Sequence, residues 1–450
     1  MSFVIQLIIG LILLFTLVLI ITERVHKTLA AMIGAGLTII VATLPGSGEN
    51  GSFLIPDIEH AIQLIEIDLI LVIIGITLMV GVARTTGLFD FITLVILKKS
   101  GNNQFKLLAA LSFLTLIFSA LLDAYMAIII VSSITIVACD ALDINPKPFI
   151  LAEAIFGDLG GIITRIASPP NLILGGHFDI DFITFFLLTS PFAFCASFLT
   201  LVIWSIIFRK DLTKPISSSQ YHEILLINER AVITDPKSFQ NAAIILIGTI
   251  LAFIITPFLP MKIELGYISL AGGFLMVGLV KTDFHEALST IEWEIVFFLI
   301  GLLTVIGIAE KVGILEIIVE PLNYIFSLNT LGGILFLQWI TALASAILDN
   351  IPVATIMTSV MDSLIEEYPL ELPFVPFLLS VVIGTNLGGN ITPIGSASTV
   401  QAISFLDRVE REDAKTTFIE FVKIGGSVAF FQLLLGSLYI ILMWIIFSPL

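Results

Sequence analysis

Residues 345–352 read SAILDNIP and place an acid, Asp349, and an amide, Asn350, inside one of the most apolar parts of the chain. A charged side chain at the centre of a membrane costs roughly 2.5–3.5 kcal/mol on insertion scales, so such a residue indicates function. The stretch has a counterpart 226 positions earlier, because residues 119–130 read SALLDAYMAIII and align Asp123 with Asp349. Two copies of one acid-bearing element predict a duplicated protein with a single site between its halves.

The composition is that of a membrane protein. Hydrophobic residues make up 58% of the chain and charged residues 12%, whereas a soluble domain carries about 25% charged residues. Runs of 18 or more apolar residues recur, and each is long enough to cross ~30 Å of hydrocarbon. The first run, residues 3–21, lacks the basic start and small-residue cleavage site of a signal peptide, so we expect a retained span. The predicted fold class is an all-α polytopic membrane protein.

The spans follow one order twice. In a first half, residues 1–208, apolar segments are expected at 3–22, 28–44, 67–83, 106–139 (interrupted at Asp123), 149–176 (broken at residues 168–170) and 183–208. Residues 209–240 are polar and form the expected cytoplasmic linker. In a second half, residues 241–450, segments are expected at 241–259, 265–280, 294–310, 331–364 (interrupted at Asp349), 374–406 (broken near Gly395) and 421–447. An amphipathic tail follows the third segment of each half, ending near residues 99 and 328.

The repeat extends beyond the two acids. Residues 158–168 match residues 386–396 at 7 of 11 positions, and Gly75 aligns with Gly301. If the segments around Asp123 and Asp349 are re-entrant hairpins, each half crosses the membrane five times and the halves are inverted. The prediction is therefore about ten transmembrane helices plus two hairpins. Seventeen of the 20 lysines and arginines, Lys27 among them, fall on the linker side, which places both termini outside.

The interruptions are the candidate site. Backbone broken at membrane depth must line a cavity or be buried in protein, and the helix starting after each break offers free N–H groups and partial positive charge. Asp123 and Asp349 are expected to bind a transported cation such as Na⁺, protons, or each in turn; the alternative is that each only caps a hairpin arm. Arg165 is expected to pair with Asp123, Asp158 or Asp349, or to contact an anionic substrate.

Other chemistries lack a motif. The sequence has no GxxxxGK[ST] loop, so ATP is not the expected energy source. Its five histidines and two cysteines form no cluster with metal-ligand spacing, and Cys139 and Cys195 are expected to be packing residues. No cofactor, resident metal or nucleic-acid partner is predicted.

The motifs resemble the ion transporter superfamily. SALLDA, GGIITRIASPPN, SAILDNIP and NLGGNITPIGSAS are similar to its citrate-transporter-like branch, which holds arsenite permeases, bacterial sodium/proton antiporters and the melanosomal P protein. The resemblance covers roughly residues 20–445. It implies a transport domain that moves against a scaffold in a homodimer, with substrate at the hairpin tips and helix breaks. By position, the implied site holds Asp123, Ser168, Asn171, Asp349, Asn350, Asn386, Asn390, Ser396 and Ser398.

The first half departs from this pattern. Asp123 is followed by Ala124-Tyr125-Met126, where relatives usually have asparagine and then a threonine. The first break has Ser168 where relatives usually have aspartate, and Arg165 adds a charge. What the first half binds is therefore left open.

We predict a secondary active transporter of the plasma membrane that works by alternating access. Both tips carry an acid. The formal charges of the central ionisable residues, Asp123, Asp158, Asp349 and Arg165, sum to −2, and a negative site favours proton-coupled cation (Na⁺/H⁺) antiport. The alternatives are efflux of arsenite or an oxyanion and transport of a di- or tricarboxylate. Two rival classes of protein are a passive channel and an intramembrane aspartyl protease. The residues around Asp123 lack the Gly-x-Gly-Asp pattern of such a protease.

Overall fold

A computed structural model describes residues 3–447 except 23, 46, 49–51, 56, 369–371, 410 and 412. These described residues form helices and turns and no strand. Eight helices among them are long and apolar enough to cross a membrane, and four shorter apolar helices accompany them. The predicted class, an all-α polytopic membrane protein, is therefore confirmed.

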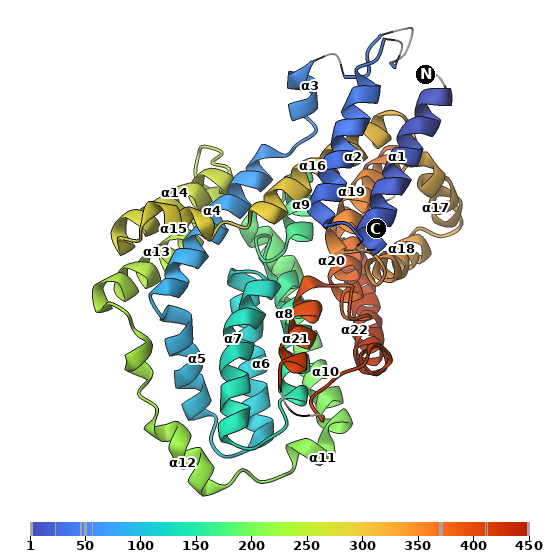
Figure 1. Ribbon diagram of the computed structural model, residues 1–450. Coiled ribbons are helices and arrows are strands. Elements are labelled where there is room, and N and C mark those ends of the chain that lie inside the picture. Colours follow the sequence, from blue (N-terminus) through green and yellow to red (C-terminus); the bar gives the residue numbers. More distant parts are fainter. Residues whose placement is uncertain are drawn as a thin grey trace.

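The helices of the first half follow the predicted segments. They are α1 (Phe3–Thr22), α2 (Lys27–Ala42), α3 (Ile58–Ile62), α4 (Ile67–Thr85), α5 (Leu88–Lys99), α6 (Gln104–Leu121), α7 (Ala124–Ala141), α8 (Lys147–Ile163), α9 (Pro169–His177) and α10 (Phe182–Ile207). Only the short α3 has no counterpart in the prediction. Figure 1 shows α6 and α7 standing side by side as the two arms of a hairpin.

The second half repeats this order. It contains α13 (Pro236–Ile255), α14 (Leu265–Val280), α15 (Phe284–Ser289), α16 (Trp293–Lys311), α17 (Glu316–Leu328), α18 (Thr330–Ser345), α19 (Asn350–Glu367), α20 (Phe374–Gly388), α21 (Ala397–Asp407) and α22 (Phe418–Phe447). The short α15 was not predicted. Helices α18 and α19 form the second hairpin, which turns at residues 346–349.

The polar segment between the halves is shorter than predicted and partly helical. It contains α11 (Arg209–Leu212), α12 (Ser218–Leu226) and the 3₁₀ turn Glu229–Val232. Helix α13 already begins at Pro236, because the Asp235 carboxylate accepts a bond from the Ser238 N–H at 2.8 Å and proline fits the first helical position. The segment therefore ends at residue 235 rather than 240. Figure 1 shows α11 and α12 along the lower edge, far from α3.

Helices of the two halves pack against each other in matching pairs. Helix α4 packs along α14, and α16 packs along α2. A Cβ atom on Gly75 would lie 2.2 Å from the carbonyl carbon of Ser269, and one on Gly301 would lie 2.7 Å from that of Ala31. Backbones that approach this closely require glycine, which explains why these two aligned positions share it.

The two hairpins are also anchored alike. The Ser119 hydroxyl donates to the Gly157 carbonyl at 2.6 Å, and the aligned Ser345 hydroxyl donates to the Thr385 carbonyl at 2.7 Å. Thr164 and Thr392 hold the carbonyls of Ala120 and Ala346 at 2.7 and 2.6 Å. Each hairpin is thus fixed to the broken helix of its own half by the same hydroxyl contacts. The inverted relation of the halves stays a prediction.

Candidate functional site

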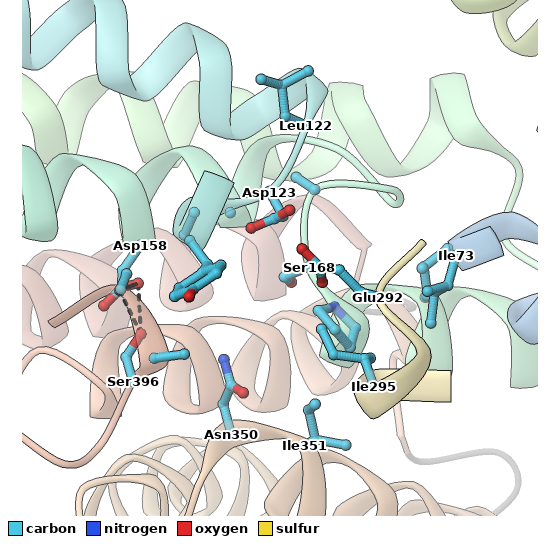
Figure 2. A pocket seen from close by; sticks show the side chains of 18 of the residues that line it. Ile73, Leu122, Asp123, Asp158, Ser168, Glu292, Ile295, Asn350, Ile351 and Ser396 are labelled. Carbon is cyan, nitrogen blue, oxygen red and sulfur yellow. Dashed lines mark hydrogen bonds between the residues drawn. The ribbon is translucent and has the colours of Figure 1, made fainter. Parts of the chain in front are cut away.

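A cavity of about 110 Å³ lies where both hairpin tips and both helix breaks meet (Figure 2). Eight of the eleven predicted site residues line it: Asp123, Asp158, Ser168, Asp349, Asn350, Asn386, Ser396 and Ser398. The tips contribute the two acids that the repeat aligned. The cavity is therefore built from elements far apart in the sequence, as a site between two halves requires.

The first break is closed by an asparagine. Helix α8 ends at Ile163, and α9 starts at Pro169 with Ser168 as its N-cap. The Asn171 Nδ2 atom donates to the carbonyls of Gly161 at 2.6 Å and Thr164 at 2.9 Å. Both carbonyls lie at the end of α8, where the helical hydrogen-bond ladder stops. Asn171 therefore stabilises the break and does not line the cavity.

Each break is bonded by a side chain from the other half. In the first half, Asp158 Oδ1 accepts from the hydroxyls of Ser396 at 2.9 Å and Ser398 at 2.5 Å. In the second half, the aligned Asn386 accepts from the Ser168 hydroxyl at 3.2 Å and donates to Asn171 Oδ1 at 3.0 Å. The two contacts mirror each other, but only Asp158 carries a charge.

The Asp158 carboxylate is half-satisfied. Its Oδ2 atom is buried and has no hydrogen-bond partner among the described residues. A buried carboxylate oxygen without a donor is costly unless a proton, a cation or water meets it. Asp158 is thus a group on the cavity wall that can accept a positive charge.

The two tip acids differ in their partners. Asp123 caps its own arm, since Oδ1 accepts from the Met126 N–H at 2.9 Å. Asp349 occupies the N-cap position of α19 but makes no capping bond, and its Oδ2 atom lies 2.6 Å from the Lys27 ammonium. The capping alternative therefore describes Asp123 in part and Asp349 not at all.

Two charged residues of the cavity were not predicted. Lys27 is the first residue of α2, and Glu292 is the N-cap of α16. Figure 2 shows the Glu292 carboxylate pointing to the same space as Asp123, beside Ser168. Both lie at the start of an apolar segment, where a charge normally marks a membrane interface. The repeat did hold a signal for Glu292, because it aligns with Glu66 at the offset of 226, although Glu66 does not line the cavity.

Arg165 does not pair with the central acids, so that prediction is wrong. Its guanidinium donates to the Ile180 carbonyl at 3.0 Å and lies 3.9 Å from Asp68 Oδ2. The bend at residues 164–168 turns its side chain along Gly175 and toward the start of α4, away from the cavity. Its charge therefore does not offset the cavity acids.

Asn390 also lies outside the cavity. Its Nδ2 atom donates to Gln432 Oε1 on α22 at 3.4 Å. Gln432 in turn donates to the Thr200 hydroxyl on α10 at 2.8 Å. Asn390 is thus part of a buried polar chain that joins the segment after α20 to α22 and α10, and it holds that segment in place.

The cavity is acidic. Among the described residues that line it are four acids, Asp123, Asp158, Glu292 and Asp349, and one base, Lys27, giving −3 if all five side chains are charged. This charge suits a cation.

Hairpin tips and broken helices around a charged cavity are typical of membrane transporters. The family model described as "Citrate transporter" matches residues 17–371. The chain belongs to this family, so the resemblance seen in its motifs is confirmed, and the family is one of transporters rather than enzymes.

Individual relatives are distant but extensive. The "46 kDa membrane protein" of Mycobacterium leprae is 25% identical over 433 residues, covering 96% of this chain and 97% of the relative. The P protein of Mus musculus is 24% identical over 503 residues, covering 95% of this chain and 59% of that protein. The solved YdaH transporter of Alcanivorax borkumensis has a TM-score of 0.61 at 12% identity, covering 94% of this chain and 100% of that chain. The last likeness concerns the fold alone.

Proposed function

We propose that this transporter exchanges a small monovalent cation, Na⁺ or Li⁺, for protons by alternating access. The observation that carries the proposal is the set of four carboxyl groups around a cavity of about 110 Å³. A carboxylate holds a proton or a cation and never both, so one site reached from alternate sides couples the two fluxes. No further group is needed for exchange.

The arrangement of charges supports a cation further. Each acid comes from a different element: Asp123 from the first tip, Asp349 from the second, Asp158 from α8 and Glu292 from α16. Carboxylate oxygens are hard ligands suited to alkali and other hard cations. A relative displacement of these elements would therefore break the site apart and release the ion.

A di- or tricarboxylate is the second candidate. The family description names citrate, and four helices (α7, α9, α19 and α21) begin beside the cavity. Their N–H groups, with Lys27, could bind a carboxylate. Four acids in the same space oppose this, because each would repel the substrate.

We propose a plasma-membrane location with both termini outside and the polar segment in the cytoplasm. The distribution of lysines and arginines supports it, although Lys27 no longer counts as a loop residue. A homodimer in the bilayer is the expected assembly. Cysteine labelling at Ser219 in the linker tests the side, since only membrane-permeant reagents should react in intact cells.

Reconstituted protein on a solid-supported membrane tests the function. Jumps of Na⁺, Li⁺, arsenite, succinate and citrate at two pH values should give currents with Na⁺ or Li⁺ only. An opposing proton gradient should drive ²²Na⁺ uptake in liposomes, which a passive channel would not couple. Currents with citrate but not with Na⁺ or Li⁺ would replace the first candidate by the second.

A further inference from the structure

Lys27 places a positive charge at the cavity itself. Its Nζ atom lies 2.6 Å from Asp349 Oδ2 and 5.4 Å from the ring centroid of Phe298 on α16. The Lys27 side chain is 35% exposed and that of Asp349 is 18% exposed. The pair is therefore close and partly shielded, and the ammonium is more accessible than the carboxylate.

The ion pair joins two packed groups of helices. Lys27 begins α2, which packs along α16 and α1. Asp349 belongs to the hairpin of α18 and α19, which is held against α20. The contact therefore depends on how these two groups lie relative to each other.

The Asp349 carboxylate is poised to exchange its partner. It receives no capping bond from α19, so the ammonium of Lys27 is the partner that holds Oδ2. An ammonium is a compact, strongly hydrated point charge on a flexible stem, with the same charge as a monovalent metal ion. A cation that enters the cavity and binds Asp349 must displace it.

We propose that Lys27 is a tethered competitor for the transported cation and sets the affinity and selectivity of the site. Its ammonium occupies Asp349 in the cation-free carrier, and a bound cation replaces it there. This inference rests on the proposed function. It makes Lys27 an opponent of cation binding, whereas a carboxylate transporter would use Lys27 as a ligand, so the two roles predict opposite effects of its removal.

The test is Lys27→Met in purified, reconstituted protein at fixed pH. The Na⁺ concentration that gives half-maximal current should fall about tenfold, equivalent to ~1.4 kcal/mol, and selectivity between Na⁺ and Li⁺ should narrow. Na⁺-dependent thermal stabilisation in detergent should shift by the same factor. Lys27→Gln repeats the test if the methionine variant folds poorly, and Lys106→Met, at an exposed position of α6, is the control.

A double-variant cycle isolates the pair. In Asp349→Asn protein, where the competed carboxylate is gone, Lys27→Met should leave residual Na⁺-dependent stabilisation unchanged. If wild-type protein responds to Na⁺ and the Lys27→Met variant binds Na⁺ with weaker or unchanged affinity, the role proposed for Lys27 is overturned and the proposed function is not. Wild-type protein without a response to Na⁺ or Li⁺ would overturn the proposed function, and this inference with it.

Discussion

The two hairpin tips share the pattern SAxLD and differ in the contacts of their acids. Asp123 bonds its own arm through Met126 and forms no ion pair among the described residues, whereas Asp349 leaves its arm uncapped and pairs with Lys27. The hairpins are otherwise held by the same serine and threonine contacts. The repeat therefore fixes the backbone of both tips, and the neighbours brought in from α2 and α16 decide what each acid does.

The helix breaks differ in the same way. Asp158 and Asn386 occupy aligned positions and bond the opposite break, yet one is an acid and the other an amide. A symmetric scaffold thus holds an asymmetric set of charges. The following variants test whether this asymmetry carries the function.

The largest effect is expected from neutralising either tip. Asp123→Asn and Asp349→Asn should each lower proton-driven Na⁺ uptake by roughly 10- to 150-fold, the equivalent of one charge-assisted contact of about 1.5–3 kcal/mol. Asparagine keeps the size of the side chain, so the fold should persist. Uptake in proteoliposomes measures this, and unchanged coupled exchange in either variant would remove that acid from the proposed site.

Exchanging the charges of the two breaks should have a smaller effect. Asp158→Asn keeps an acceptor for Ser396 and Ser398 and should weaken Na⁺ affinity by about tenfold, the equivalent of ~1.4 kcal/mol. Asn386→Asp is the matched reverse change at the aligned position. If Asn386→Asp restores Na⁺ affinity to Asp158→Asn protein, the site needs one carboxylate at a break and either half can supply it. If affinity does not recover, the two halves are not interchangeable.

The two tip variants should also differ in thermal stability, by a smaller amount. Asp349→Asn leaves the Lys27 ammonium without its carboxylate and should cost about 1 kcal/mol, since the pair is only partly exposed. Asp123→Asn should cost only a few tenths of a kcal/mol, because asparagine also caps helices. Unfolding midpoints in detergent without Na⁺ measure the difference. A larger loss in Asp123→Asn would contradict the assigned roles.

The smallest effect on the site is expected from Arg165→Gln. Arg165 contacts Ile180 and Asp68 and not the cavity, so half-saturation by Na⁺ should change less than twofold, which is under about 0.4 kcal/mol. The midpoint of thermal unfolding should fall, because the contact between the first break and α4 is lost. A large shift in Na⁺ affinity would return Arg165 to the site.

Much of the fold was predictable, because apolar length and polar interruptions are local features. The predicted break at residues 168–170 and the interruption at Asp349 needed only proline, serine and aspartate in apolar surroundings, and helices do start there, at Pro169 and Asn350. The polar segment was predicted too long because its last residues, from Pro236, form a helix start that the general polarity concealed.

The site was predictable only where the repeat marked it. The tip acids and the break serines stand out because each lies in a motif that occurs twice. Lys27 has no such mark, because the aligned residue is Phe253, and the acid shared by Glu66 and Glu292 was overlooked. Arg165 looked central because it lies between two marked residues. Its direction depends on the turn at residues 164–168, which sequence spacing does not define.

The sequence by itself determined a duplicated helical membrane protein with acids at two hairpin tips and breaks in two further helices, since hydrophobic length and unsatisfied backbone leave few alternatives in a bilayer. Tertiary structure alone decided which charges meet. Helix packing brought Lys27 to Asp349 and Glu292 to the cavity and took Arg165 away from it, because ion pairs depend on distances of a few ångströms between residues hundreds of positions apart.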